Sequence, residues 1–197
     1  SKFMITGATG LIGSTLVRCI LALNNGASIT IPVRNKEKAI AMYGADASGL
    51  NIVECDLMEY CTNLNEEFDY IIHCASPTAG KYMNEHPVET YELAVETTRA
   101  LLQYARKHTI KGMVYVSSLE YYGQNFDDHV ITEDFQGYVD ATSARSSYPM
   151  GKRAAEYLCA AYALEYVIPV KIGRLTQTFG AGVAADDNRV FAQFARS

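Results

Sequence analysis

The chain has 197 residues, of which 49% are hydrophobic and 20% are charged, and its formal net charge is −5. These are ordinary values for a globular domain with a sizeable core, and they exclude a disordered or fibrous chain. Lysine and arginine are scattered rather than clustered, so the charge pattern excludes the usual nucleic-acid binder or anionic-membrane binder.

Short apolar runs alternate with stretches of helical period along the chain. The runs that predict strands are Phe3–Thr6, Ser28–Val33, Asn51–Glu54, Tyr70–Cys74, Gly112–Ser117 and Val170–Arg174. Helices are predicted at about Ile12–Asn24, Lys36–Met42, Pro87–Lys107 and Tyr148–Tyr166. Because this alternation is typical of βαβ units, the sequence predicts an α/β fold with a Rossmann-type, doubly wound parallel sheet.

A polar stretch from Gln124 to Ser147 shows little periodicity, so we expect a long surface loop there. The last residues, from Val190 to Ser197, are apolar at helical spacing but end without a capping residue. We therefore expect residues 1–180 to form one nucleotide-binding domain. Residues 181–197 would begin a C-terminal substrate domain that is largely missing from this chain.

The first predicted strand leads into a glycine-rich turn that opens the first helix. Its GxxGxxG spacing suits a tight turn, a close approach of the backbone to a pyrophosphate, and close packing of helix on strand. Unpaired N–H groups at the start of the helix then favour the phosphate charge. The residues expected to form this dinucleotide cradle are Gly7, Thr9, Gly10, Leu11, Ile12 and Gly13.

The ends of the second and third predicted strands bear on which dinucleotide is bound. This chain has Arg34 and then Asn35 where a carboxylate would hold the ribose hydroxyls, which favours the 2′-phosphate of NADP. Arginine also stacks on adenine, so NAD stays open. Asp56 and Leu57 follow the third strand, where the carboxylate meets the adenine amino group or is an ordinary turn residue.

Acid–base chemistry is indicated in the second half of the chain. Tyr148 and Lys152 lie four residues apart, hence on one face of a helix, and the ammonium favours a tyrosine phenolate that accepts a substrate proton. Ser118 follows a buried strand, at the edge where parallel α/β sheets bind ligands. We expect Ser118 to orient the substrate oxygen and Glu120 to act as a second acid or base. The alternatives are a strand-end cap and a solvated carboxylate.

The remaining histidines and cysteines show no pattern of a metal or disulfide site. The four histidines (His73, His86, His108 and His129) have no ligand spacing, and the five cysteines form no CxxC pair. We therefore expect structural histidines, reduced thiols and no metal ion. The start of the chain lacks a signal-peptide pattern, and no apolar run is long enough to span a membrane, which favours a cytoplasmic protein.

In combination, the glycine turn, Ser118, Tyr148 and Lys152 resemble the extended short-chain dehydrogenase/reductase family of nucleotide-sugar epimerases, dehydratases and decarboxylases, over nearly the whole chain. Within that family the chain looks most like UDP-glucuronate decarboxylases and members of the dTDP-glucose 4,6-dehydratase type. The stretches that carry this likeness are His73–Pro77 with Tyr82, Pro87–Thr90, Ser118–Gly123, Arg145, Gly151–Glu156 and Asp187–Val190.

The resemblance implies transient oxidation at sugar C4, chemistry on the 4-keto sugar, and return of the hydride to the same NAD(P). It implies that Tyr148 is the base, Ser118 the orienting hydroxyl, and Lys152 the ribose anchor that activates Tyr148. The further residues that it implies are Glu120 as an auxiliary acid or base, Ala75 as a cofactor contact, and Arg145 and Gln177 as contacts of the nucleotide-sugar substrate.

The chain departs from the family pattern at four positions. Arg34 stands where many members have an acidic residue, and Ala94 stands where an Asn of a proton relay is usual. Leu119 precedes Glu120 where dehydratases tend to have an Asp-Glu pair, which disfavours a standard dehydratase. Gln177 replaces an Asn near the pyrophosphate of the nucleotide sugar.

Two other functions stay open from the sequence. One is an NADP-dependent carbonyl reductase, and the other is a non-catalytic dinucleotide-sensing or interaction module. The family dimerises through its two long helices, here 87–107 and 148–166, so we expect a homodimer. Small and apolar residues at helical spacing suit such an interface, although burial against the sheet explains some of them equally well: Ala154, Ala155, Leu158, Ala161 and Tyr162.

Overall fold

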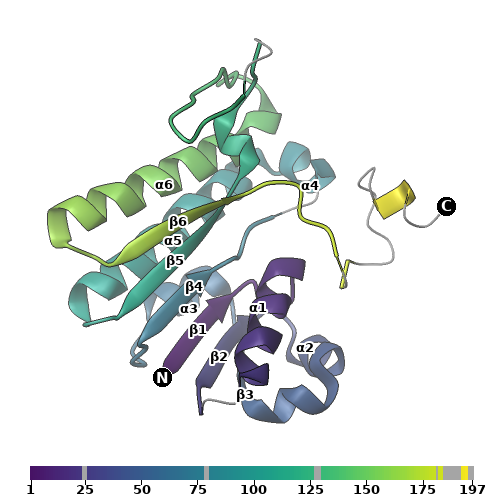
Figure 1. Cartoon of the computed structure of the whole chain (residues 1–197), viewed down its shortest axis with the longest axis vertical. Helices are drawn as coiled ribbons and strands as arrows, with labels where there is room; N and C mark the ends of the chain where they lie inside the picture. Colours follow the sequence, from purple (N-terminus) through teal and green to yellow (C-terminus); the bar gives the residue numbers. More distant parts are fainter. Residues whose placement is uncertain (24–25, 78–79, 127–129, 181, 184–191, 195–197) are drawn as a thin grey trace.

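One parallel sheet organises the part of the chain that the computed structural model describes, namely residues 1–23, 26–77, 80–126, 130–180, 182–183 and 192–194. Its strands are β1 (Lys2–Thr6), β2 (Ser28–Val33), β3 (Leu50–Glu54), β4 (Tyr70–His73), β5 (Gly112–Ser118) and β6 (Val170–Leu175). Neighbouring strands are parallel, in the order β3-β2-β1-β4-β5-β6 (Figure 1). The predicted Rossmann-type sheet is thereby confirmed.

Each predicted strand is present, and both of its ends lie within one residue of the prediction. The strands were predictable because they are buried. In β2, for example, every side chain after Ser28 is buried, and a strand of this kind appears in the sequence as an unbroken apolar run. The strand order reverses between β1 and β4. In sheets of this kind, ligands bind beyond the carboxyl ends of the strands at that reversal.

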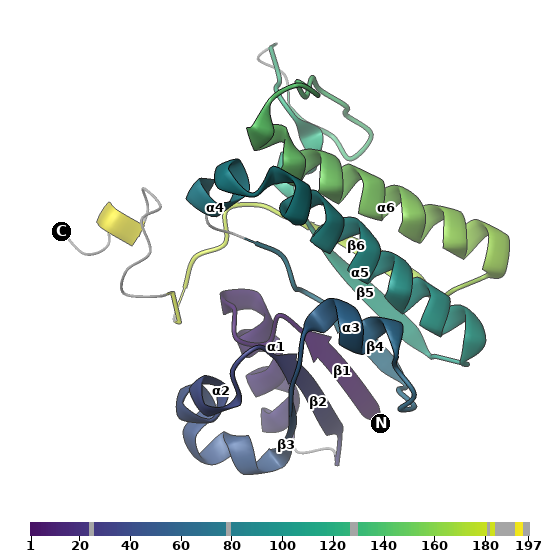
Figure 2. The ribbon, with the colours of Figure 1, turned by 180° about the vertical axis from the view of Figure 1, so that it is seen from behind.

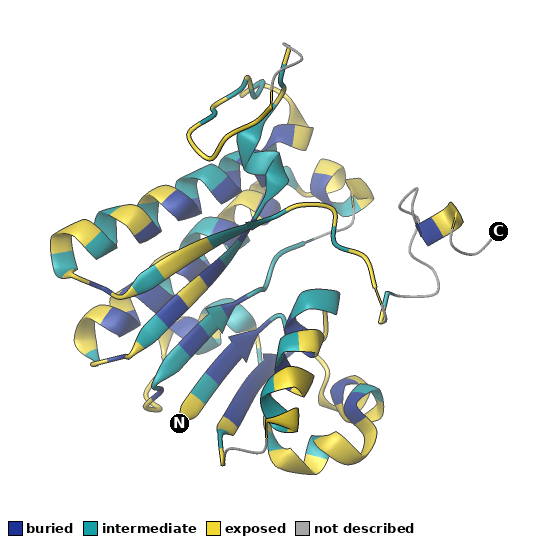
Figure 3. Cartoon of the chain, in the orientation of Figure 1, coloured by how far each residue is buried: buried dark blue, intermediate teal, exposed yellow. Residues whose placement is uncertain are grey.

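Helices cover the sheet on two faces (Figures 1 and 2). On one face, α1 (Leu11–Ala22) and α2 (Lys36–Tyr43) pack on β1, β2 and β3 around Ile5, Val17 and Ile31. On the other, α3 (Leu57–Thr62), α5 (Pro87–Lys107) and α6 (Ser147–Tyr166) enclose a second core around Leu101 and Tyr115. A short α4 (Gly80–Glu85) precedes α5. Figure 3 shows buried positions on both sides of the sheet.

The four predicted helices are present, and α5 has the predicted bounds. Helix α1 is described to Ala22, and the predicted end at Asn24 lies outside the described residues. The sequence missed α3, α4 and three 3₁₀ segments, η1 (Gly44–Gly49), η2 (Leu119–Tyr122) and η3 (Ala144–Ser146). Segments of six residues or fewer are too short to display a helical period.

The predicted surface loop is described at residues 124–126 and 130–147, and two of its four aspartates, Asp127 and Asp128, lie outside the described residues. An isolated antiparallel bridge joins Gln124 to Tyr138. The end of the stretch is helical rather than looped, because η3 leads directly into α6 at Ser147. Most of the predicted 181–197 region also lies outside the described residues.

Candidate active site

The turn between β1 and α1 has a backbone that only glycine fits at two positions. Gly7 has a φ of +67°, and a Cβ there would lie 2.7 Å from Ala75 N. A Cβ on Gly13 would lie 2.3 Å from the Gly7 oxygen. Gly10 is the N-cap of α1 and provides no side-chain hydrogen bond, so the first N–H groups of this helix are not capped. This arrangement fits an anion such as a pyrophosphate.

The other residues of the expected cradle lie in the same turn. Thr9 is exposed, whereas Leu11 and Ile12, the first residues of α1, are half-buried. The turn is fixed internally by a hydrogen bond from Gly10 N to the Gly7 oxygen at 3.0 Å.

Beneath the turn, His73 joins β1, β4 and α5. Its ring is 1% exposed, with Nδ1 2.7 Å from Thr6 Oγ1 and Nε2 3.4 Å from Thr97 Oγ1. Thr6 Oγ1 also accepts a hydrogen bond from Ala75 N at 3.2 Å, which holds Ala75 beside Gly7. Burial, assisted by the Lys152 charge, lowers the pKa of His73 to about 3, so this histidine is neutral and structural.

The residues after β2 and β3 lie at the same edge of the sheet as the glycine turn. Arg34 is exposed, and within the described part of the chain no carboxylate forms an ion pair with it. The Asn35 and Asp56 side chains accept hydrogen bonds from the backbone N–H three residues on, at 2.7 and 3.0 Å. Asn35 therefore caps α2, and Asp56 caps α3, which begins at Leu57.

Ser118, Tyr148 and Lys152 come together at the carboxyl end of β5. Ser118 is the last residue of β5, while Tyr148 and Lys152 lie in the first two turns of α6. The Lys152 side chain is 2% exposed, donates from Nζ to the Val116 oxygen at 2.9 Å, and lies 5.6 Å from the centre of the Tyr148 ring. The structure thus assembles three side chains that the sequence singled out from separate segments.

Burial displaces the pKa values of both ionisable groups of this cluster. It raises the pKa of Tyr148 above 10.0, and the Ser118 hydroxyl acts in the opposite direction by hydrogen bonding. It also lowers the pKa of Lys152 to about 8. Lys152 therefore still carries most of its charge at neutral pH, where it favours a nearby phenolate. Displaced pKa values beside a specific partner are typical of functional sites.

Glu120 and Arg145 form an ion pair beside the cluster. Arg145 Nη2, from η3, lies 2.7 Å from the Glu120 carboxylate, which comes from η2. The two side chains are 44% and 33% exposed, so solvent or a ligand reaches both of them. Gln177 is exposed beyond the end of β6, and within the described residues no hydrogen bond joins it to this pair.

Three charged residues that sequence reasoning missed hold η2, the turn that follows Ser118. Arg153 Nε donates to the Tyr121 oxygen at 2.6 Å, and its Nη2 donates to the Tyr122 oxygen at 3.2 Å. Arg174 donates from Nε and Nη2 to the buried Glu156 carboxylate at 2.8 to 3.1 Å, and its guanidinium lies 3.5 Å from the centre of the Tyr121 ring. We call Arg153, Glu156 and Arg174 the arginine clamp.

The replacement at Ala94 has a packing consequence. Ala94 is 3% exposed, and a Cβ on Gly151 would lie 3.1 Å from the Ala94 Cβ. Because Ala94 and Gly151 are both small, α5 approaches α6 closely at the turn of α6 that carries Tyr148 and Lys152. A larger side chain at Ala94 would push α6 away from α5.

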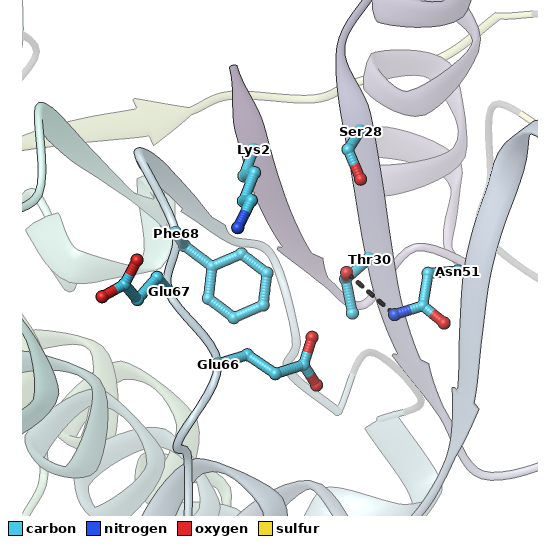
Figure 4. Close-up of a pocket in the computed structure, with 7 residues that line it drawn as sticks. All are labelled: Lys2, Ser28, Thr30, Asn51, Glu66, Glu67 and Phe68. Atoms are coloured by element: carbon cyan, nitrogen blue, oxygen red, sulfur yellow. Dashed lines mark hydrogen bonds between the residues drawn. The ribbon is translucent and has the colours of Figure 1, made fainter.

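A separate pocket of about 230 Å³ lies at the opposite end of the sheet (Figure 4). Lys2 and Ser28, the first residues of β1 and β2, line it together with Thr30, Asn51, Glu66, Glu67 and Phe68. Asn51 Nδ2 donates to Thr30 Oγ1 at 3.2 Å inside it. Because it adjoins the amino ends of the strands, it is remote from the cluster at the carboxyl ends.

In the described residues, no helix is long and apolar enough to cross a membrane. No group of His, Cys, Asp and Glu side chains in the same residues is arranged to hold a metal ion. All five cysteines are described and none is in a disulfide, with Cys61 and Cys159 buried and Cys19 exposed.

Solved structures with the same fold include nucleotide-sugar epimerases and dehydratases. UDP-glucuronic acid 4-epimerase from Bacillus cereus, in complex with UDP-glucuronic acid and NAD, has a TM-score of 0.78 at 20% identity over 95% of this chain and 60% of its own. dTDP-glucose 4,6-dehydratase from Streptomyces venezuelae, with NAD bound, has a TM-score of 0.81 at 23% identity over 100% and 61% of the two chains. At these identities the likeness establishes the fold.

Curated relatives include UDP-glucuronic acid decarboxylase 1 of Danio rerio, which is 26% identical over 98% of this chain and 45% of its own length. UDP-glucuronic acid decarboxylase 6 of Arabidopsis thaliana is 29% identical over 98% of this chain and 55% of its own. The chain thus spans about half the length of these relatives. The family model for the NAD dependent epimerase/dehydratase family matches residues 3–197. The chain therefore belongs to the NAD dependent epimerase/dehydratase family.

Proposed function

We propose that the protein is an NAD(P)-dependent nucleotide-sugar epimerase, dehydratase or decarboxylase that acts by transient oxidation at sugar C4. The observation that carries this proposal is the cluster of Ser118, Tyr148 and buried Lys152 at the same sheet edge as the glycine turn. Residues 1–180 would be the dinucleotide-binding domain, and residues 181–197 would begin the substrate-binding region.

The cradle fits a dinucleotide because Gly7 and Gly13 leave no room for a Cβ while the start of α1 is not capped by a side chain. A bound nicotinamide ring supplies the hydride acceptor at this site. Thr9, Gly10, Leu11 and Ile12 would line the pyrophosphate, and Ala75 would adjoin the nicotinamide end.

The chain's own residues move the proton. Tyr148, as phenolate, accepts the proton of the sugar C4 hydroxyl while hydride leaves C4, and returns it when the C4 ketone is reduced. Ser118 holds the C4 oxygen beside Tyr148. The Lys152 ammonium, fixed by the Val116 oxygen, favours the phenolate and holds the ribose. Glu120 serves as the auxiliary acid or base for the chemistry on the 4-keto sugar.

Two polar side chains near the cluster, Arg145 and Gln177, would contact the substrate. Arg145 is partly exposed and paired with Glu120, so a substrate carboxylate or phosphate oxygen would compete with Glu120 for its guanidinium. Gln177 is exposed at the carboxyl edge of the sheet, where it would contact the nucleotide-sugar pyrophosphate. The names of the curated relatives suggest a UDP-uronate as the first substrate to try.

The two alternative functions are less well supported. A non-catalytic module has no need of a buried lysine and tyrosine with displaced pKa values. A carbonyl reductase has the same cluster, but it consumes one NADPH for each product.

The deciding experiment offers the protein a panel of UDP-, dTDP-, GDP- and CDP-sugars. It measures the products formed and the oxidation state of the nicotinamide. Product formation without net NAD(P)H consumption is expected, whereas binding without turnover, or stoichiometric NADPH oxidation, would overturn the proposal.

For the cofactor, we propose a preference for NADP that depends on Arg34. An exposed guanidinium without a described carboxylate partner is available to a 2′-phosphate. Arg34→Ala should weaken NADP binding by about 10-fold and change NAD binding little, as measured by titration of cofactor-free protein. The control is Lys38→Ala, which removes a different exposed cation, one that lies in α2. Tighter binding of NAD than of NADP by the unaltered protein would contradict the preference.

We also propose a homodimer through the outer faces of α5 and α6. Each of these helices exposes two apolar side chains: Val88 (68%) and Tyr91 (40%) on α5, and Tyr157 (72%) and Leu164 (88%) on α6. Ala154 and Ala161 lie on the same stripe of α6 as Tyr157 and Leu164. Of the other apolar residues expected at this interface, Ala155 is fully buried in the core and Leu158 and Tyr162 pack against it. The proposed interface therefore shifts outward to Tyr157 and Leu164.

Sedimentation should show a dimer for the unaltered protein and a monomer for Tyr157→Glu, because a carboxylate in an apolar interface is left without its hydration. Leu23→Glu makes the same kind of change at a side chain that is 69% exposed next to α1, and this variant should stay dimeric. A monomer at all concentrations of the unaltered protein would refute the dimer.

We propose the cytoplasm as the location of the protein. Its free thiols, two of them buried, suit that reducing compartment.

A further inference from the structure

We propose that Ser76 is a second catalytic hydroxyl, which donates a hydrogen bond to the phenol oxygen of Tyr148 when that group is ionised. The inference rests on the proposed function, since it concerns the same proton transfer. Ser76 was not predicted as a site residue, because serine is common after a strand.

The register of the sheet brings Ser76 and Ser118 to the same edge of two neighbouring strands. Strands β4 and β5 are parallel neighbours in which His73 pairs with Tyr115. Ser76 lies three residues after His73, and Ser118 lies three residues after Tyr115. The two serines therefore leave the carboxyl edge of the sheet from adjacent strands, with the start of α6 close to both.

The backbone that carries Ser76 is held in place from below. Ala75 N donates to Thr6 Oγ1 at 3.2 Å, and Thr6 is itself bound to buried His73. The position of Ser76 is thus fixed by β1 as well as by β4, which is what a group acting on a reacting atom requires.

The Ser76 hydroxyl is buried and has no hydrogen-bond partner among the described residues. A buried hydroxyl left in this state is unfavourable, so a missing partner is expected from a ligand or a reacting group. Tyr148 is the candidate partner: burial raises the pKa of its phenol, while the Ser118 hydroxyl and then the Ser76 hydroxyl act to lower it. The Ser76 hydroxyl is thus close enough to the phenol to affect its pKa, although no hydrogen bond joins the two in the described structure.

Ser118 is already committed in part, because its Oγ accepts a hydrogen bond from Glu120 N at 3.2 Å. That bond fixes Oγ and leaves the Ser118 O–H to donate. With Ser76 as a second donor, the Tyr148 oxygen still receives a hydrogen bond when the Ser118 O–H donates to the substrate C4 oxygen, and this bond stabilises the phenolate.

The test compares Ser76→Ala with Ser76→Thr in the cofactor-loaded protein. Ser76→Ala should lower kcat at neutral pH by about 10- to 100-fold, because a hydrogen bond to a charged group is lost. The loss should shrink as pH rises, because the phenolate then forms without help, so that the kinetic pKa moves up. Ser76→Thr keeps a hydroxyl and should restore most of kcat. Ser76→Cys, of similar size but a weaker donor, should behave like Ser76→Ala.

A readout that needs no turnover is the pH titration of phenolate absorbance, taken as the difference between each variant and the same variant carrying Tyr148→Phe. The Tyr148 transition should move to higher pH in Ser76→Ala. Ser117→Ala is the matched control, since its Oγ is also buried without a described partner but lies one residue before Ser118 on β5. Its kinetic and spectroscopic pKa values should not move.

An equal loss of kcat at every pH, or an unchanged phenolate titration, would overturn the role of Ser76 and point to a structural hydroxyl. Weaker cofactor binding with an unchanged titration would likewise overturn it, in favour of a ribose contact. If no nucleotide sugar is turned over by the unaltered protein, the proposed function fails, whereas the absorbance titration still decides the contact between Ser76 and Tyr148.

Discussion

Tyr148→Phe should lower kcat by about 10²- to 10⁴-fold while leaving the fold and dinucleotide binding intact. The change removes only the phenol oxygen, which is the proposed proton acceptor, and keeps a ring that is 9% exposed in its place at the start of α6. Lys152 keeps its hydrogen bond to the Val116 oxygen, so the charge beside the site persists. The measurement is the initial rate of sugar-nucleotide conversion, with cofactor affinity determined in parallel by titration.

Tyr115→Phe is the matched control for this loss. The Tyr115 side chain is 1% exposed, its ring lies 4.9 Å from Lys152 Nζ, and its hydroxyl has no hydrogen-bond partner within the described residues. Removal of that hydroxyl leaves the ring in contact with Lys152 and should leave kcat nearly unchanged. If Tyr148→Phe retains activity close to that of Tyr115→Phe, Tyr148 is not the base.

Glu156→Gln is expected to have the largest effect on stability, with a loss of about 3 kcal/mol in the free energy of unfolding. Glu156 is 5% exposed and receives hydrogen bonds from Arg174, whose side chain is 19% exposed. Without the carboxylate, the guanidinium stays largely buried with no compensating charge. Denaturant unfolding followed by circular dichroism measures the change.

The double variant Glu156→Gln with Arg174→Met should recover part of this loss, because it removes the uncompensated cation as well. Glu96→Gln is the control, since it breaks an ion pair with Arg99 in which both side chains are at least one-third exposed. Its effect should stay below about 1 kcal/mol. A loss for Glu156→Gln that is no greater than for Glu96→Gln would contradict a structural role of the arginine clamp.

The elements of the fold were predictable because their signals are local. The buried strands have runs of apolar residues, and the glycine turn is recognisable from the spacing of its glycines between a strand and a helix. Tyr148 and Lys152 were identified because four residues make about one turn of helix, and Ser118 because it ends a buried strand. The short helices α3 and α4 were missed since so few residues show no period.

The roles of residues that suit two functions could not be predicted from their positions in the sequence. Asn35 and Asp56 stand where a cofactor contact is expected, yet each also caps the following helix. Ala94 looked like a lost relay residue, whereas the structure gives it a packing role against Gly151. The caps are local contacts that do not exclude a cofactor contact, whereas the packing of Ala94 against Gly151 joins two helices whose distance the sequence does not contain.

The sequence by itself determined the parallel α/β fold, because buried strands and helices have a local period. It also predicted a dinucleotide cradle at the glycine turn and singled out Ser118, Tyr148 and Lys152, since each of these signals lies within one element or at its end. Only the tertiary structure decided that Ser76 and Ser118 reach the same edge of the sheet from the neighbouring strands β4 and β5, and that Arg174 pairs with Glu156, 18 positions earlier in the chain. Such pairings arise from how strands and helices pack on one another. Packing is fixed by the whole core rather than by any local stretch of sequence.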